Sequence, residues 1–221
     1  LMAADARLRS LPYWESLEPV PARGEGPGRD GRDPRYLRCL AAYEQQAARM
    51  PLLRAMHDMP PEHVHEEIEI QDLDFATYEL EWLATVPRWR DHYLSLDMRP
   101  HYAYLKKGLQ ALQWMRGAER WVLKSPQHLE QLRPLFATFP DATIVITHRD
   151  PVSVIRSAIT MLAYGDRMRR TRLDLPGQLH DCRHIQNQRN RSIAAERRAG
   201  DPAHVAVVLG QRLDDHILLS E

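Results

Sequence analysis

Basic and hydroxyl side chains lie close together in one stretch of the sequence, residues 142–157. Arg149 is followed there by Ser153 and Ser157, which are four residues apart. In a helix, residues at this spacing share one side, and the amides and positive dipole end of the first turn favour an anion. An arginine next to such a helix start can bind phosphate through charge-assisted hydrogen bonds. The pattern therefore predicts a phosphate site; the alternative is an ordinary salt bridge of Arg149 beside two solvated serines.

The elements that must position these side chains are a strand and the helix that follows it. Residues 144–146 are a short β-branched apolar run, which is typical of a covered strand in a parallel sheet. Asp150 is a good N-cap, and Pro151 suits the first helical position. We expect a strand over 142–148 and a helix over 151–163. At 100° per residue the apolar side chains of this helix share one face: Val152, Ile155, Ile159 and Leu162.

A second cation, Lys124, ends a short apolar segment over 121–124 that we expect to be another strand. A lysine at the carboxyl end of a parallel strand points into the crevice where α/β folds bind ligands. If the two strands are parallel neighbours, Lys124 and Arg149 lie at the same edge of the sheet. The alternative for Lys124 is a surface lysine whose stem packs along the strand.

The rest of the chain divides at its prolines and glycines into helices and loops. The expected elements are the end of a helix over 1–10, a loop over 19–34, a helix over 35–50, an acidic segment of helical spacing over 62–81, a helix opened by Pro87 and interrupted by Pro100, a helical piece ended by Gly117, a helix over 126–138 with a kink or early end at Pro134, a solvated helix over 183–199 and a strand over 203–209. The alternation of strands and helices over 121–163 predicts an α/β fold with parallel strands.

The composition limits the class of protein. The 221 residues suffice for one α/β domain, and 30 Lys and Arg balance 30 Asp and Glu, so no net charge favours nucleic acid or a membrane. Two cysteines, Cys39 and Cys182, lack metal-type spacing and fit a reducing cytosol, so we expect a cytoplasmic protein. Neither a membrane-spanning run nor a signal peptide is found. Because the first residue is Leu1, we expect a fragment that lacks an upstream segment.

Three short segments together resemble the sulfotransferase family, in its bacterial branch with a Lys-Ser-Pro strand end. They are Lys124-Ser-Pro-Gln-His, Phe139-Pro-Asp-Ala, and Thr147-His-Arg-Asp-Pro with Ser157 eight residues after Arg149. The resemblance covers about residues 1–172, the expected sulfotransferase-like core. Residues 173–221 stay an unassigned C-terminal segment.

The resemblance implies a reaction, a donor and a fold. Members move a sulfo group from 3′-phosphoadenosine 5′-phosphosulfate (PAPS) to a hydroxyl or amine. By resemblance, Arg149 and Ser157 hold the 3′-phosphate, and Lys124 lies beside the sulfo group. The implied fold is P-loop-like, a helix-rich three-layer α/β/α arrangement around a parallel sheet, incomplete here because the loop that cradles the 5′-phosphosulfate would precede Leu1. We expect a small-molecule, lipid or carbohydrate acceptor, and neither a metal nor nucleic acid.

A general base must take the proton of the acceptor, and relatives use Glu or His for this step. The acidic segment supplies Glu66 and Glu67 as candidates; the alternative is a solvated acidic helix start, which is stabilising without any chemistry. His128 and His148 stand near the expected strand ends, with a structural role as the alternative. The arginines over 167–172 either help to hold an anion or form a solvated face.

Two other classes of function stay open at this point. The first is a nucleotide-binding or anion-binding fragment without turnover, which the absent loop would produce. The second is a relative of the P-loop kinases, although the chain contains no Gly-x4-Gly-Lys-Ser/Thr segment.

Overall fold

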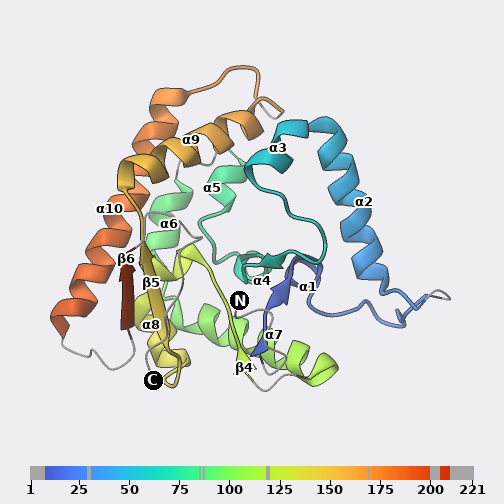
Figure 1. Cartoon of the computed structure of the whole chain (residues 1–221). Coiled ribbons are helices and arrows are strands. Elements are labelled where there is room, and N and C mark those ends of the chain that lie inside the picture. The colour runs from blue at the N-terminus through green and yellow to red at the C-terminus, as the bar shows by residue number, and fades with distance from the viewer. Residues whose placement is uncertain are drawn as a thin grey trace. The chain divides into compact units, whose positions relative to one another are not determined.

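The computed structural model describes residues 8–28, 31–84, 86, 88–117, 120–168, 170–199 and 205–209. The chain forms two compact units, Leu1–His128 and Leu129–Glu221. Figure 1 shows the chain and labels the helices of both units and the strands β4, β5 and β6.

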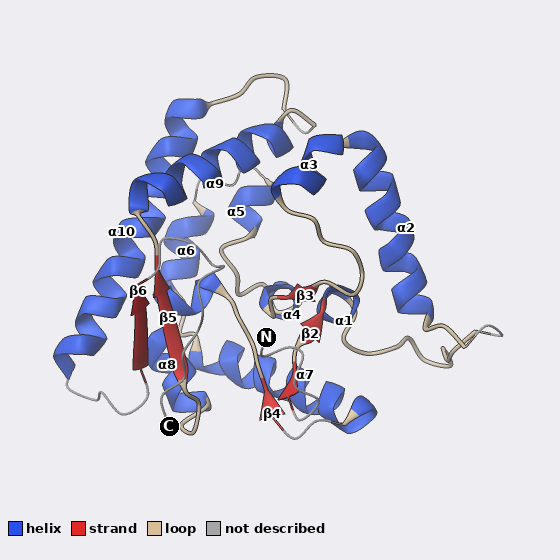
Figure 2. Ribbon diagram, in the orientation of Figure 1, coloured by secondary structure: helices blue, strands red, loops and turns tan. Residues whose placement is uncertain are grey.

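The first unit contains two short ladders of strands (Figure 2). Strand β1 (Leu8–Arg9) pairs in parallel with β4 (Arg120–Trp121), and β2 (Leu11–Pro12) pairs antiparallel with β3 (Val64–His65). The helix expected over 1–10 is wrong for its described part, because Leu8–Arg9 is a strand. Strand β4 is shorter than the expected 121–124, so Lys124 follows it by three residues.

Long-range contacts of Arg9 explain why local sequence preference fails at β1. The Arg9 guanidinium donates to the Leu112 carbonyl oxygen at 2.7 Å and to Glu15 Oε2 at 2.7 Å. The Glu15 side chain is 1% exposed and also pairs with Arg116 at 2.6 Å. A buried carboxylate held by two guanidinium groups thus fixes the first strand against the end of a distant helix.

Seven helices are described in the first unit. They are α1 (Tyr13–Leu17), α2 (Pro34–Arg49), α3 (Pro51–Met56), α4 (Ile68–Asp72), α5 (Leu80–Leu83), α6 (Trp89–Ser95) and α7 (Arg99–Arg116). The loop before α2 and the helix itself are confirmed, and the Asp33 side chain caps the helix by accepting from Arg35 N at 3.0 Å. Pro100 stands in the first turn of α7 and so begins a helix where an interruption was expected. Gly117 ends α7 with φ 67°, as expected for a C-terminal glycine.

The core of this unit lies between α4 and α7. Ile70, Tyr102, Leu105 and Leu112 are each at most 1% exposed. Helix α4 packs on α7 at Gly108, where an added Cβ would lie 3.0 Å from Ile70 Cγ2. This close approach fixes the segment that precedes α4, which includes Glu66 and Glu67.

The chain passes into the second unit within a 3-10 helix, Pro126–Glu130, and continues with α8 (Leu132–Thr138). The single helix expected over 126–138 is therefore wrong: it is divided at Gln131. Pro134 lies in the first turn of α8, where a missing amide costs no hydrogen bond, so it does not kink the helix.

The second unit is built on a parallel pair of strands. Strand β5 (Ile144–His148) pairs with β6 (Val205–Leu209) in the register Ile144 to Val205 through His148 to Leu209. Both strands and the helix after β5, α9 (Pro151–Asp166), confirm the expected elements. A parallel pair followed by a helix is the arrangement of an α/β fold.

Helix α10 (Leu175–Ala199) packs against α9. It begins eight residues before the expected start at 183, and it is not simply solvated, because Cys182, Ile185 and Ile193 are buried. At the end of α9, Asp166 Oδ2 accepts from Gln178 Nε2 at 2.6 Å and pairs with Arg170 at 3.0 Å. A buried carboxylate thus joins the two helices.

Candidate functional site

Lys124 lies at the end of an extended segment that follows β4. Its ammonium forms an ion pair with the Glu66 carboxylate. The Lys124 side chain is 71% exposed and that of Glu66 is 16% exposed, so the pair stands at the surface with its carboxylate half-covered. Burial raises the pKa of Glu66, and the neighbouring Lys124 ammonium partly offsets this rise. Glu66 therefore becomes a stronger proton acceptor whenever Lys124 leaves it.

Glu67 holds the same lysine from the other end. Its Oε2 accepts the Lys124 backbone N–H at 3.2 Å, and its Oε1 is hydrogen-bonded to His128 Nε2. His128 Nδ1 in turn lies 2.8 Å from the Tyr102 hydroxyl. Glu67 is fully buried, so it contacts the lysine backbone and His128 without reaching the surface.

Gln127 fixes the Lys-Ser-Pro-Gln-His segment onto the turn after α4. Its amide donates to Gln71 Oε1 at 3.0 Å and to the Ala76 carbonyl at 2.9 Å, and its oxygen accepts from Tyr78 N at 3.1 Å. All three contacts are buried. Sequence reasoning assigned no role to Gln127, because a single buried glutamine leaves no periodic pattern.

Three histidines, His57, His63 and His65, lie together in the first unit, and the sequence reasoning did not assign them. The ring centroids of His57 and His63 are 5.9 Å apart, and those of His63 and His65 are 5.6 Å apart. His65 Nε2 is 2.5 Å from Glu69 Oε1. Burial lowers the pKa of His57 and of His63, and neighbouring cations lower it further. The half-buried imidazoles are thereby kept neutral near pH 7.

The turn from β5 into α9 contains the expected phosphate site. Asp150 caps the helix: its Oδ2 accepts from Ser153 N and from Ser153 Oγ, each at 2.8 Å. These hydrogen bonds lower the pKa of Asp150. The side chains of Arg149 and Ser157 are exposed. The N-cap is thus confirmed, and the Ser153 hydroxyl already has an intramolecular acceptor.

The apolar face expected for α9 is only partly covered. Ile155 and Ile159 are half-buried, whereas Val152 is 57% exposed, so the packing expected for Val152 is wrong in this structure. The His148 side chain lies outside the described residues. Lys124 and Arg149 belong to different units, so their place at one sheet edge stays a prediction.

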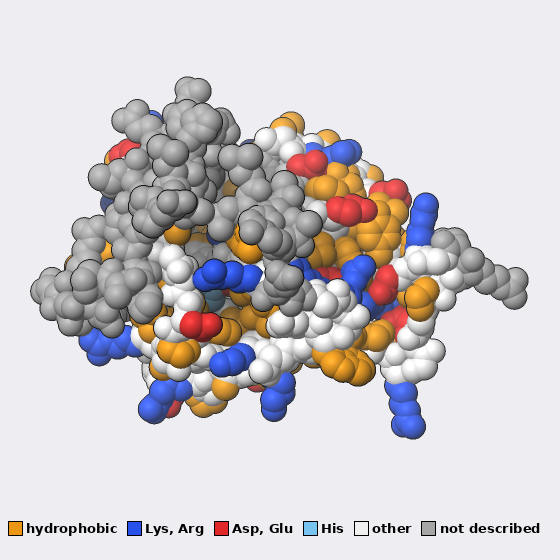
Figure 3. All heavy atoms as spheres, turned by 60° about the horizontal axis from the view of Figure 1, so that its bottom comes forward, with side chains coloured by type: hydrophobic (Ala, Val, Ile, Leu, Met, Phe, Trp, Pro, Cys, Tyr) orange, Lys and Arg blue, Asp and Glu red, His pale blue; other side chains and the backbone are white. Residues whose placement is uncertain are grey.

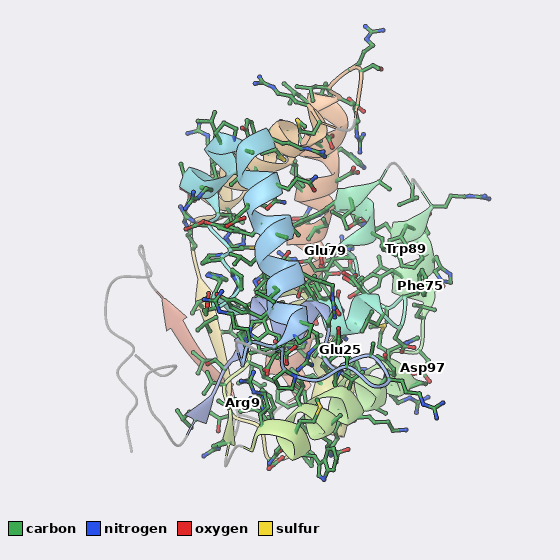
Figure 4. All side chains as sticks on the ribbon, turned by 90° about the vertical axis from the view of Figure 1, so that its right-hand side faces the viewer. Arg9, Glu25, Phe75, Glu79, Trp89 and Asp97 are labelled. Carbon is green, nitrogen blue, oxygen red and sulfur yellow. The ribbon has the colours of Figure 1, made fainter. Side chains whose placement is uncertain are left out.

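Two half-buried acids, Asp72 and Glu79, interact in the first unit, and Glu79 is labelled in Figure 4. Burial raises the pKa of Glu79 to about 8 and that of Asp72 to about 6. The charge of Asp72 raises the pKa of Glu79 further, whereas the hydrogen bond from Glu79 partly lowers that of Asp72. The pair therefore retains one proton near neutral pH.

The described part of the chain also bears on two other classes of feature, membrane-spanning helices and metal sites. No helix in this part of the chain is long and apolar enough to cross a membrane. Among the same residues, no three His, Cys, Asp or Glu side chains are arranged to hold a metal ion. On the face shown in Figure 3, acidic and basic side chains both occur between apolar ones.

The chain resembles two solved mycobacterial structures. Sulfotransferase STF9 from Mycobacterium avium is 23% identical with a TM-score of 0.75, and the match covers 94% of this chain and 54% of that one. Sulfotransferase STF1 from Mycobacterium tuberculosis H37Rv is 24% identical with a TM-score of 0.73, and the match covers 94% of this chain and 56% of that one. This chain thus spans little more than half the length of either protein, and the likeness confirms the P-loop-like α/β fold.

Sequence comparisons give the family. No curated protein matches the chain. The model of the sulfotransferase family matches residues 1–213, which includes most of the C-terminal segment that the sequence left unassigned. The match extends over both compact units. The chain therefore belongs to the sulfotransferase family.

Proposed function

We propose that this protein transfers a sulfo group from PAPS to a hydroxyl or amine of a small-molecule, lipid or carbohydrate acceptor. The observation that carries the proposal is the ion pair between the exposed Lys124, three residues after β4, and the half-buried Glu66 in a sulfotransferase-family chain. The pair supplies a mobile cation for a departing anion and a half-buried carboxylate for a proton. Both are needed in sulfo transfer, where positioning and charge stabilisation do most of the work.

The residues at the start of α9 fit a phosphate group. Arg149 offers a planar, exposed guanidinium, and Ser157 presents an exposed hydroxyl two turns into the helix. Because Ser153 donates to Asp150, we assign the 3′-phosphate of PAPS chiefly to Arg149 and Ser157. Ser153 contributes by keeping the helix capped and the following turn in place.

The ion pair also sets the sequence of events in the proposed reaction, because Glu66 can take a proton only after Lys124 has left it. Lys124 leaves Glu66 to contact the bridging oxygen between sulfur and phosphorus. The acceptor oxygen attacks sulfur, the bond from sulfur to the bridging oxygen breaks, and its electron pair stays on the phosphate, where Lys124 stabilises it. Glu66, now without its cation, takes the acceptor proton, since burial already raises its pKa.

The proposal is tested by measuring sulfo transfer from radiolabelled PAPS to a panel of hydroxyl and amine acceptors. Lys124→Ala is expected to lower kcat by about 10²–10³-fold, the usual cost of one charge-stabilising donor. Exposed Lys107 on α7 gives the matched control, and Lys107→Ala should behave like the wild type. Equal rates for both variants, or adenosine 3′,5′-bisphosphate binding without any transfer, would contradict the assignment and favour a binding protein without turnover.

A further inference from the structure

Two successive glutamates hold the two ends of one lysine. Glu66 pairs with the Lys124 ammonium, and Glu67 accepts the Lys124 backbone N–H at 3.2 Å. Glu67 precedes α4 directly and is its N-cap residue, so the two carboxylates share one anchored turn. The Lys124 side chain is flexible and 71% exposed. The position of the Lys124 backbone therefore determines which atoms its ammonium can contact.

The Glu67 carboxylate is itself held in place by a hydrogen bond of the oxygen that does not contact Lys124. Its second oxygen is hydrogen-bonded to His128 Nε2, and His128 Nδ1 is 2.8 Å from the hydroxyl of Tyr102 on α7. Glu67 and Tyr102 are fully buried, and the His128 side chain is 15% exposed. Both carboxylate oxygens and both imidazole nitrogens are thus used, which leaves a single orientation for Glu67.

We propose that Glu67 and His128 are positioning residues for sulfo transfer that act through Lys124. They hold the backbone from which the Lys124 ammonium moves between Glu66 and the bridging oxygen. The inference rests on the proposed function, because that function gives Lys124 its contact with the reacting atoms. Neither Glu67 nor His128 touches the substrate, and Glu67 takes no part in proton transfer.

A double-mutant cycle tests whether Glu67 acts through Lys124. Glu67→Ala is expected to lower kcat about 10²-fold, the cost of misplacing a group by about 1 Å, with little change in KM for PAPS. Glu67→Gln should keep most of the kcat, because its amide oxygen still accepts the Lys124 N–H. In a Lys124→Ala background, Glu67→Ala should cause no further loss, since the group it positions is gone.

His128 is tested in the same way. His128→Gln places an amide nitrogen where Nε2 lies and should keep most of the kcat, whereas His128→Ala should follow Glu67→Ala. Trp89→Phe is the matched control, because it removes another partly buried hydrogen bond of this unit, from Trp89 Nε1 to the Thr77 carbonyl at 2.7 Å. This variant should lose stability without a change in kcat.

Amide hydrogen exchange of Lys124 gives a readout that needs no turnover. The Lys124 N–H should be protected in the wild type and in Glu67→Gln, and should exchange faster in Glu67→Ala and His128→Ala. If the Lys124 N–H exchanges fast in Glu67→Ala but the wild type transfers no sulfo group, the proposed function is overturned, while the role of Glu67 in holding the Lys124 backbone is supported. An unchanged kcat in Glu67→Ala, or an equal loss of kcat in the Lys124→Ala background, would overturn the positioning role.

Discussion

Replacing Glu79 by glutamine should remove a pH-dependent loss of stability. Asp72 and Glu79 are half-buried beside each other, and their carboxyl pKa values rise to about 6 and about 8. Burial is the largest cause, followed for Glu79 by the charge of Asp72. A raised carboxyl pKa means that the fold favours the protonated form. The stabilising contribution is therefore complete below the unfolded value, near pH 4, and is lost as the pH rises through 8.

The size of this loss in the free energy of unfolding follows from the linkage between proton binding and stability. Each tenfold difference in proton affinity between the folded and unfolded chain is worth about 1.4 kcal/mol, so the rise of the Glu79 pKa from 4.5 to about 8 costs roughly 4 kcal/mol of stability by pH 8. In Glu79→Gln the amide still reaches Asp72 as a donor, but no proton is lost from position 79. The free energy of unfolding of this variant should hence fall much less between pH 5 and pH 8 than that of the wild type.

Urea unfolding followed by circular dichroism at pH 5, 6, 7 and 8 measures this difference. Glu44→Gln, an exposed acid on α2, is the matched control and should follow the wild type. Comparison at each pH removes the contribution of the ionisable groups that all three proteins share. Parallel curves for the wild type and Glu79→Gln would refute the shared-proton reasoning.

Three further changes probe other parts of the structure. Phe75 has φ 51° and is 68% exposed, so Phe75→Asn, which tolerates this conformation, should raise Tm by about 2–4 °C in a thermal scan. Asp150→Ala removes the cap of α9 and should lower Tm by about 2–4 °C, whereas Asp150→Asn should keep it. Gln127→Ala leaves three buried partners unsatisfied and should cost roughly 3 kcal/mol in urea unfolding; a loss near zero would contradict the network.

Elements with strong local signals could be predicted from the sequence. The strand Ile144–His148 and the helix from Pro151 were predicted because a β-branched run, an N-cap and a first-turn proline agree with one another. The end of α7 was predicted from Gly117, a glycine at a helix C-terminus, although Pro100 was wrongly expected to interrupt that helix. By contrast, Leu8–Arg9 looked helical, and it is a strand only because Arg9 reaches Glu15 and a distant carbonyl.

In the candidate site too, local signals identified individual residues, whereas their contacts depend on residues far apart in the sequence. Lys124 and Glu66 were singled out as residue types at a strand end and in an acidic segment, and the structure joins them in an ion pair. Their pairing connects residues 58 positions apart, and no local pattern specifies it. The burial of Glu67, its contact with His128 and the proton shared by Asp72 and Glu79 depend on packing around α4, which periodicity alone does not give.

Calorimetric titration with adenosine 3′,5′-bisphosphate and with adenosine 5′-monophosphate tests most directly whether this protein holds the PAPS donor by its 3′-phosphate. The wild type should prefer the bisphosphate. Arg149→Ala should weaken bisphosphate binding by about 10–100-fold, the worth of a charge-assisted hydrogen bond, and leave the monophosphate almost unaffected. Ser157→Ala should show the same selectivity with a smaller loss, and exposed Arg156→Ala on the same helix should show none. Equal affinity of the wild type for the two nucleotides, or equal losses for both in Arg149→Ala, would contradict the account.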